Sequence, residues 1–235
     1  MRALLLAAGL GTRLKPITNN IPKCLVDING QPLLKIWLDL IFKSKLIDKV
    51  LINTHYLHKK VTDFVETTSF ESKIEITFEQ SLLGTGGTIL QNKAFFDNKS
   101  FFVAHADNLA KFDIDRFIRF HNKRDKKILI TMMTFRTDEP SNCGIVELND
   151  YGYVINFHEK KKDPPGNLAN AAIYIFQPEV IEYIQTLNKN IIDISTDVIP
   201  KFLGKIQAYQ NNLYLRDIGN LKSLELGCKE YKLKM

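Results

Sequence analysis

The chain has 235 residues, 45% of them apolar and 25% charged, with a formal net charge of +6. This length and balance predict one globular domain with room for an insertion, and no apolar run is long enough to cross a membrane or resembles a signal peptide. The positive charge fits solubility or attraction of anionic substrates, whereas the basic residues are too dispersed for a nucleic-acid site. Three scattered cysteines form neither a disulfide framework nor a metal pattern, which favours a reducing cytoplasm.

An apolar run over 3–8 opens the chain and leads into Gly9-Leu10-Gly11-Thr12-Arg13. This pattern predicts a buried strand and a tight glycine turn whose N–H groups can surround phosphate. Lys15 and Lys23 follow closely, so the stretch is typical of a polyphosphate site. A dinucleotide fingerprint would need glycine where Leu14 stands, and a P-loop would need Gly-Lys-Ser/Thr. A plain chain reversal remains an alternative, but it leaves Arg13 and the Pro22-Lys23 pair unexplained.

The segments up to residue 135 alternate between helical and strand patterns. Helices are expected over 32–46, 56–67, 88–95 and 113–123, and strands over 49–54, 74–78, 101–104 and 128–135. The glycine-rich residues 84–87 are expected to form a second loop where backbone approaches a ligand. Alternation favours βαβ units on a parallel sheet, whose ligands bind at the carboxyl ends of the strands. Both glycine segments and Asp107 follow predicted strand ends, so one site is expected there.

The alternation of helix and strand patterns ends after Cys143. Short strands are expected over 144–148, 154–158 and 172–176, separated by turn signals, and they predict a smaller antiparallel insertion. Helices are expected over 178–187 and 194–203, although Pro200 should break the second. Strands over 206–209 and 214–218 and a final helix from 220 complete the pattern. The basic cluster at 123–127, interrupted by Asp125, is expected to be a solvated helix end. No hexapeptide repeat is present, so no appended β-helix is expected.

The opening motif resembles the signature of the sugar-1-phosphate nucleotidylyltransferases, the nucleotide-sugar pyrophosphorylases. It reads Ala-Ala-Gly-Leu-Gly-Thr-Arg-Leu-Lys-Pro-Ile-Thr over 7–18, followed by Pro22-Lys23. The remaining motifs follow in the family's order across nearly the whole chain. The resemblance implies a mostly parallel Rossmann-like α/β sheet flanked by helices, with a smaller antiparallel sugar-side insertion. It also implies one domain over 1–235, with a nucleotide-binding half (1–140) and a sugar-binding half with the C-terminal helices (141–235).

The resemblance also implies four catalytic residues. Arg13 would stabilise the leaving pyrophosphate, Lys23 would contact the α-phosphate, and Asp107 and Asp217 would bind Mg²⁺. The chain has Ala106 where family members usually have glycine, a mild departure. Either aspartate alone could be a turn or helix cap, a role that suits Asp193 and Asp197 better. The paired match favours a metal role for Asp107 and Asp217.

Two further groups of residues follow from the same resemblance. The nucleotide-binding residues would be Leu6, Ala7, Ala8, Gly9, Gly11, Thr12, Glu79, Gly84 and Thr85. The sugar-phosphate residues would be Gly144, Glu159, Lys160 and Asn170. Both groups have an alternative without a binding role: residues 84–87 as a helix N-terminus with permissive glycines, and Glu159-Lys160 as a surface pair. The five histidines have no metal-binding spacing and are expected to be structural or on the surface, although His105 lies near Asp107.

The activity implied is transfer of a nucleotidyl group from a nucleoside triphosphate to a sugar 1-phosphate, releasing pyrophosphate. Mg²⁺ is the expected cofactor. The motifs are most similar to members that use GTP and a manno-configured sugar, mannose or heptose. A uridylyltransferase for N-acetylmuramic acid 1-phosphate or glucose 1-phosphate is one alternative, and a non-catalytic nucleotide-sugar-binding regulator is another. The expected partners are the two substrates and possible further copies of the chain, with no nucleic acid or membrane.

Overall fold

Two units, each with its own β-strands, make up residues 1–233, which this computed structural model describes. The first unit comprises residues 1–82, 104–114 and 213 onward. The second comprises residues 83–103 and 115–212, so it is inserted twice into the sequence of the first. The expected α/β class is confirmed, since both units combine strands with helices.

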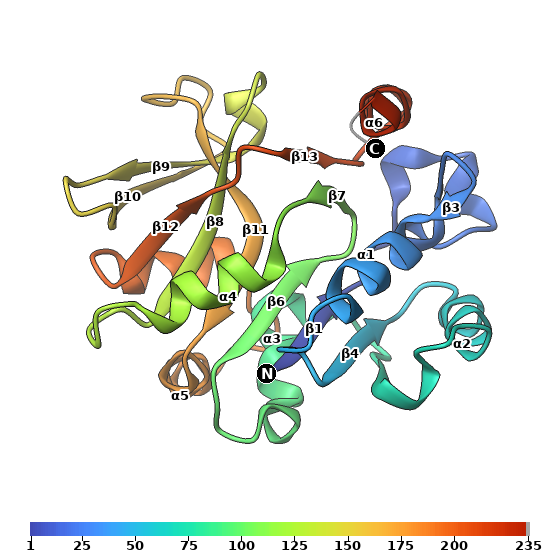
Figure 1. The fold of residues 1–235 in the computed structure, drawn as a ribbon, viewed down its shortest axis with the longest axis horizontal. Helices are drawn as coiled ribbons and strands as arrows, with labels where there is room; N and C mark the ends of the chain where they lie inside the picture. The colour runs from blue at the N-terminus through green and yellow to red at the C-terminus, as the bar shows by residue number, and fades with distance from the viewer. Residues whose placement is uncertain (234–235) are drawn as a thin grey trace. The chain divides into compact units, whose positions relative to one another are not determined.

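The first unit is built on parallel strands. β1 (Arg2–Leu6) pairs with β4 (Lys49–Thr54), and β4 pairs with β5 (Ile74–Phe78), both in parallel register. Figure 1 shows β1 and β4 side by side in blue. Ala3, Leu4 and Leu5 are fully buried, as expected for an apolar run in a sheet with both faces covered. The parallel sheet predicted for the start of the chain is therefore confirmed.

Short elements complete the first unit. A buried apolar stripe on α1 (Leu33–Phe42) that includes Trp37 explains why this segment is helical. Trp37 donates its indole N–H to the carbonyl of Asn108 at 2.8 Å. The further elements are α1 (Leu33–Phe42), α2 (His58–Glu66), β2 (Asp27–Ile28), β3 (Gln31–Pro32), β7 (Asn108–Lys111), β13 (Tyr214–Asp217) and α6 (Leu221–Leu233), with 3₁₀ turns η1 (Thr12–Leu14), η2 (Ile17–Asn19), η3 (Lys23–Leu25) and η4 (Glu71–Lys73).

The pairing of β7 with β13 brings distant parts of the sequence together. The two strands are antiparallel, with Asn108 opposite Asp217. The Arg216 guanidinium binds the Glu230 carboxylate at 2.7 Å, which ties α6 to β13. β7 and the β2–β3 pair were not predicted, because each is short and carries no clear alternation. β6 (Phe101–His105) begins in the second unit and ends in the first.

The second unit is mainly antiparallel. β9 pairs with β10, and β11 pairs with both β8 and β9, all antiparallel, while β12 runs parallel to β8. Figure 1 shows β9 and β10 as a hairpin. Its strands are β8 (Ile130–Arg136), β9 (Gly144–Leu148), β10 (Val154–Glu159), β11 (Leu168–Phe176) and β12 (Ile206–Gln210). The antiparallel insertion is confirmed, but β8 also belongs to it and does not continue the parallel βαβ pattern.

The helices of the second unit follow the predicted segments with different ends. They are α3 (Gly84–Gln91), α4 (Ile114–Asn122) and α5 (Pro178–Thr186), with 3₁₀ turns η5 (Lys93–Phe96), η6 (Pro140–Asn142) and η8 (Ile199–Phe202) and the π-helix η7 (Ile194–Val198). The single helix predicted over 194–203 is wrong, because the π-helical turn gives way to a 3₁₀ turn that contains Pro200. Proline has no N–H to continue the ladder.

The predicted loop over 84–87 is also wrong, because these residues form the first turn of α3. The N–H groups of Gly86 and Gly87 donate to the Ile192 carbonyl, at 2.8 and 3.2 Å. A Cβ on Gly86 would lie 2.7 Å from the Ile192 side chain, so close packing of two backbone segments requires small residues here. Sequence periodicity does not reveal such a contact across the unit.

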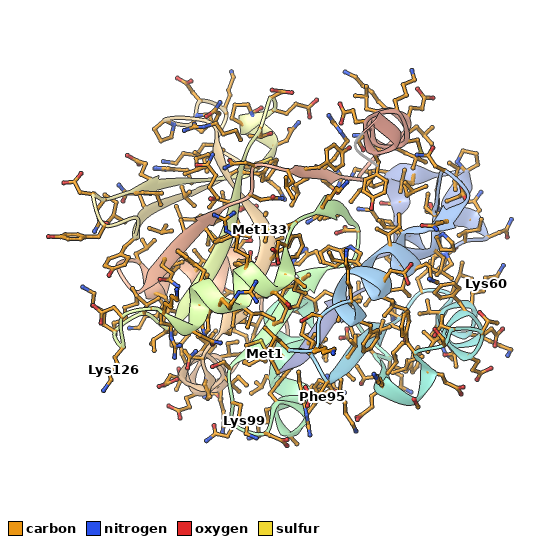
Figure 2. All side chains as sticks on the ribbon, viewed as in Figure 1. Met1, Lys60, Phe95, Lys99, Lys126 and Met133 are labelled. Carbon is orange, nitrogen blue, oxygen red and sulfur yellow. The ribbon has the colours of Figure 1, made fainter. Side chains whose placement is uncertain are left out.

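The basic cluster at 123–127 follows the end of α4, as predicted, and Lys123 and Lys126 are exposed. In Figure 2, Lys126 and, on α2, Lys60 point away from the ribbon.

Inside the second unit, burial lowers the pKa of His121 to about 3, so this histidine is neutral and structural. No helix among residues 1–233 combines the length and the apolar character needed to span a membrane.

Candidate active site

The glycine turn follows β1 and is exposed to solvent at Gly9, Leu10, Thr12 and Arg13. Gly11 has a left-handed φ of 64°, and its carbonyl accepts hydrogen bonds from the Thr18 hydroxyl at 2.7 Å and the Leu14 N–H at 3.0 Å. A Cβ on Gly11 would lie 3.0 Å from Thr18 and 3.2 Å from the Lys23 Cβ, whereas one on Gly9 would meet nothing within 4 Å. Gly11 therefore serves the fold, and the space above Gly9 is open to a ligand.

The Lys23 ammonium binds both predicted metal carboxylates. Its Nζ lies 2.6 Å from Asp107 Oδ2 and 3.4 Å from Asp217 Oδ1. The Lys23 side chain is only 9% exposed, against 36% for Asp107 and 57% for Asp217. A nearly buried cation thus meets two carboxylates that solvent and ligands can reach.

Backbone pairing places these carboxylates. The Ala106 N–H donates to the Leu6 carbonyl at 3.0 Å, which holds the end of β6 beside the end of β1 and the glycine turn. The Ile218 N–H donates to the Asp107 carbonyl at 3.1 Å, which continues the β7–β13 ladder. Asp107 and Asp217 are therefore neighbours through main-chain hydrogen bonds, although they lie far apart in the sequence.

The Arg13 guanidinium lies beside Gly219, as does the Asp217 carboxylate that Lys23 binds. A Cβ on Gly219 would lie 2.7 Å from Asp217 Oδ2 and 3.2 Å from Arg13 Nη2. The guanidinium and the carboxylate thus occupy the space that a side chain at this position would fill. The four residues predicted to be catalytic, Arg13, Lys23, Asp107 and Asp217, lie together in the first unit.

Charge and burial shift the pKa of Asp107 in opposite directions. Partial burial raises the pKa of the Asp107 carboxyl, but the Lys23 ammonium, His105 and hydrogen bonds to the charged form outweigh it, so this pKa is lowered. Asp107 is therefore ionised at neutral pH. Nearby, burial raises the pKa of the Cys24 thiol to about 12, which keeps it neutral beside the charged cluster.

The donor set fits a hard divalent cation. Asp107 and Asp217 direct carboxylate oxygens at one positively charged atom, and Mg²⁺ is bound in proteins by one or two carboxylates together with substrate phosphates and water. Within residues 1–233, no group of three or more His, Cys, Asp or Glu residues could hold a metal. An all-protein metal cage is thus absent from the described residues, and the two carboxylates suit a metal that arrives with phosphate.

Glu79 lies directly after β5 and is 2% exposed. Its carboxylate Oε1 accepts a hydrogen bond from Asn53 Nδ2 at 2.8 Å, and Asn53 Oδ1 accepts the Ala7 N–H at 2.7 Å. Asn53 thereby links two predicted nucleotide-binding residues. Asn53 is not among the predicted site residues, although an asparagine directly after the apolar run 50–52 is a recognisable signal in the sequence.

Gly84 and Thr85, the other predicted base-recognition residues, lie in the second unit at the start of α3. Gly84 has a left-handed φ of 76°. The Thr85 hydroxyl donates to Asp193 Oδ2 at 3.2 Å and accepts the Ile194 N–H at 2.8 Å. Asp193 also caps η7 through the N–H groups of Ser195 and Thr196, the cap role expected for it.

The four predicted sugar-phosphate residues are neighbours in the second unit. Gly144 pairs with Glu159 across β9 and β10, and a Cβ on Gly144 would lie 2.7 Å from Glu159 Oε2. On the other side of β9, Ala169 pairs with Ile145, which brings Asn170 to the same end. Lys160 has a left-handed φ of 46°, and its Nζ lies 3.4 Å from Glu159 Oε1.

A model of the nucleotidyl transferase family matches residues 2–232. The chain belongs to this family. The cluster at the glycine turn and the α/β architecture described above are therefore features of a nucleotidyl transferase chain.

Named relatives within the family differ in nucleotide. Mannose-1-phosphate guanyltransferase 2 of Candida glabrata is 30% identical over 98% of this chain and 64% of its own length. A UTP–glucose-1-phosphate uridylyltransferase of Synechocystis is 30% identical over 86% of this chain and 55% of its own length. The chain thus spans between half and two thirds of the length of these relatives, and equal identities do not select a base.

Solved structures support the same fold. A proposed glucose-1-phosphate thymidylyltransferase from Bacillus anthracis, solved with sucrose, superposes with a TM-score of 0.89 at 21% identity. The match covers 98% of this chain and 94% of that one. The architecture of the nucleotidyl transferase fold is therefore present over nearly all of this chain.

The two glycines of the turn should respond differently to alanine. Gly11→Ala should lower the free energy of unfolding by about 1–2 kcal/mol, because alanine is strained at positive φ and crowds Thr18. Gly9→Ala should change it by less than about 0.5 kcal/mol, yet weaken binding of a nucleoside triphosphate about tenfold, because the methyl group fills the open space. Urea unfolding and titration calorimetry with the common nucleoside triphosphates measure both effects. Unchanged affinity for all of them in Gly9→Ala would exclude close ligand approach there.

Proposed function

We propose that this chain transfers a nucleotidyl group from GTP to a sugar 1-phosphate, mannose or manno-heptose 1-phosphate, and releases pyrophosphate. The observation that carries the proposal is the convergence of Arg13, Lys23, Asp107 and Asp217 beside an exposed glycine turn. Two cations, two carboxylates and unobstructed backbone at one place suit a triphosphate and its metal. Membership of the nucleotidyl transferase family supports the same reaction class.

The chemistry demands little covalent participation from the protein. An oxygen of the sugar phosphate would attack the α-phosphorus in line, forming a new P–O bond while the bond to pyrophosphate breaks. A sugar phosphate with a second pKa of about 6 is already a dianion near neutral pH, so no strong base is needed. Catalysis then depends on positioning and on stabilisation of negative charge.

The described side chains have the charges for these tasks. Arg13, on the exposed turn, would bind the leaving pyrophosphate. Lys23 would bind the α-phosphate, and in the structure it neutralises two carboxylates that would otherwise repel the triphosphate. Asp107 and Asp217 would hold Mg²⁺, which supplies neutralisation of the developing phosphate charge when it is bound.

A base that reaches the Glu79 carboxylate, which is 2% exposed before ligand enters, would be guanine. A carboxylate offers only acceptors, and guanine is the common base whose Watson–Crick edge presents two adjacent donors, N1–H and N2–H. Uracil and thymine present one donor between two acceptors, which suits an amide better. The Asn53 hydrogen bond would keep the Glu79 carboxylate in one orientation.

In the second unit, Glu159 would accept hydrogen bonds from sugar hydroxyl groups, Asn170 would contact the sugar, and Lys160 would bind its phosphate. The register that aligns Gly144, Glu159 and Asn170 supports this grouping. Gly144 leaves room for the Glu159 carboxylate, as the 2.7 Å distance from its Cβ position indicates. The manno configuration rests on the similarity of the motifs to guanylyltransferases that use mannose.

A substrate grid tests the reaction. With Mg²⁺, GTP and mannose 1-phosphate should give the highest rate of pyrophosphate release among pairings of five nucleoside triphosphates with several sugar 1-phosphates. A maximum with UTP and N-acetylmuramic acid or glucose 1-phosphate would favour a uridylyltransferase. No release from any pair, with nucleotide still raising the melting temperature, would favour the regulator.

The carboxylate pair should be needed for turnover and metal binding. Its removal also leaves the nearly buried Lys23 ammonium without these partners, so the double variant should melt at a lower temperature than the wild type. Asp107→Asn combined with Asp217→Asn should reduce turnover at least about 100-fold, because several kcal/mol of charge stabilisation depend on the metal. GTP alone should still shift the melting temperature, while added Mg²⁺ should no longer increase that shift. Asp63→Asn, which removes an exposed partner of Lys59, is the control and should leave both properties unchanged. Normal turnover in the double variant would refute the metal assignment.

Glu79→Gln should change the base preference. Glutamine replaces one acceptor with a donor, so kcat/KM for GTP should fall about 10- to 100-fold, while kcat/KM for UTP should not fall. Glu75→Gln on β5, the strand that ends just before Glu79, is the matched control, because its carboxylate is exposed and binds Lys49. A GTP-to-UTP ratio that stays at the wild-type value in Glu79→Gln would remove the argument for guanine.

A further inference from the structure

An irregularity in β11 brings together two side chains that a regular strand would hold apart. Residues i and i+4 of a regular strand are about 13 Å apart, at about 3.3 Å per residue. In β11, however, Asn170 Nδ2 lies 2.6 Å from the Tyr174 hydroxyl oxygen. The register against β8 shifts between these residues, since Asn170 pairs with Thr134 and Tyr174 with Met132. Ala172, in the middle, has a left-handed φ of 52°.

The bulge fixes which way the Asn170 amide faces. The Ala172 N–H can only donate, and it donates to Asn170 Oδ1 at 3.0 Å. The Asn170 Nδ2 group must therefore face Tyr174, whose hydroxyl oxygen accepts from it. The Tyr174 O–H is then directed elsewhere, among Ser195, Asp193 and Glu159, the other polar groups that influence it.

The tyrosine is a rigid anchor for this contact. Its side chain is fully buried, and its ring stacks on Phe176 with centroids 5.1 Å apart and planes 14° apart. Phe176 in turn packs edge-on against Phe101. Burial is also the main reason that the pKa of Tyr174 is raised, so the hydroxyl is neutral at physiological pH. A buried, stacked ring gives its hydroxyl oxygen one fixed position.

The Asn170 amide retains hydrogen-bonding capacity for a ligand. Among the described residues, its hydrogen bonds use one of two N–H donors and one of two lone pairs on Oδ1. Asn170 is half-buried, whereas Tyr174 is wholly enclosed. The asparagine can therefore reach a substrate that the tyrosine cannot.

We propose that Tyr174 is a positioning residue for sugar recognition: its hydroxyl oxygen, with the bulge at Ala172, holds the Asn170 amide so that the second N–H points at a sugar hydroxyl group. The inference rests on the proposed function, in which Asn170 contacts the sugar. It adds a residue that acts through Asn170 and never touches the substrate.

A double-mutant cycle tests this. Tyr174→Phe keeps the stacked ring and removes the acceptor, so the KM for mannose 1-phosphate should rise about threefold to tenfold, the effect of one hydrogen bond. The KM for GTP should change less than about twofold. Asn170→Ala should raise the KM for mannose 1-phosphate at least as much, and adding Tyr174→Phe to it should raise that KM no further. If the substrate grid gives another best pair, that pair replaces these probes.

Tyr183→Phe is the matched control. Tyr183 lies in the same unit, and its hydroxyl donates to the Asp197 carbonyl at 3.2 Å and not to Asn170. This variant reports the cost of losing a tyrosine hydroxyl for structural reasons, and the KM for mannose 1-phosphate should not change. Melting temperatures of all variants separate effects on stability from effects on recognition.

Failure of this inference and failure of the proposed function give different results. Additive effects of Tyr174→Phe and Asn170→Ala, or equal changes in the KM for mannose 1-phosphate and the KM for GTP, would overturn the inference but leave the proposed function intact. A wild-type chain that turns over no pair would overturn the proposed function and this inference with it. Should Tyr174→Phe not fold, NMR of the wild type decides: the Asn170 side-chain amide should give slowly exchanging signals that vanish in Asn170→Asp. Exchange as fast as that of an exposed asparagine would contradict the inference.

Discussion

The ammonium of Lys23 between Asp107 and Asp217 is the interaction on which the first unit's site depends. Two carboxylates brought this close would repel each other, and the cost of that repulsion would rise as solvent is excluded. The nearly buried lysine removes the repulsion, and the lowered pKa of Asp107 follows from it. The glycine turn participates directly, because Gly11 leaves room for the Lys23 stem. Loop, cation and anions therefore stabilise one another.

Glycines in this chain occur for two different reasons, close packing and ligand access, which the sequence alone does not distinguish. Gly11, Gly86 and Gly219 lie where other protein atoms come so close that a side chain would collide with them. Gly9 has open space above it, and this openness is what a ligand requires. The sequence reveals where glycines cluster, but only the packed structure separates these cases. The glycines of residues 84–87 predict a loop for that reason, but their N–H groups at Gly86 and Gly87 bind the Ile192 carbonyl.

Local patterns predicted most elements, because apolar periodicity follows directly from burial. β4, β5 and β9 have the predicted bounds, and the parallel and antiparallel regions are where the patterns indicate except at β8, which belongs to the antiparallel region. What could not be predicted depends on distant contacts, such as the β7–β13 pair and the bulge in β11. For the site, motif order was enough to select the residues that gather around Lys23. It could not reveal Asn53, which donates a hydrogen bond to Glu79, or Tyr174, which accepts one from Asn170, because these contacts exist only in the folded chain.

The β7–β13 pairing also has a consequence for the newly made chain. Asp107 emerges from the ribosome well before Asp217, and the main-chain bond from Ile218 to Asp107 cannot form until the later segment has been synthesised. Between the two lies most of the second unit, residues 115–212. The charge cluster is thus assembled late, by closing a long loop whose entropic cost grows only slowly with length. A nascent chain that ends before β13 has Lys23 and Asp107 but not the finished cluster.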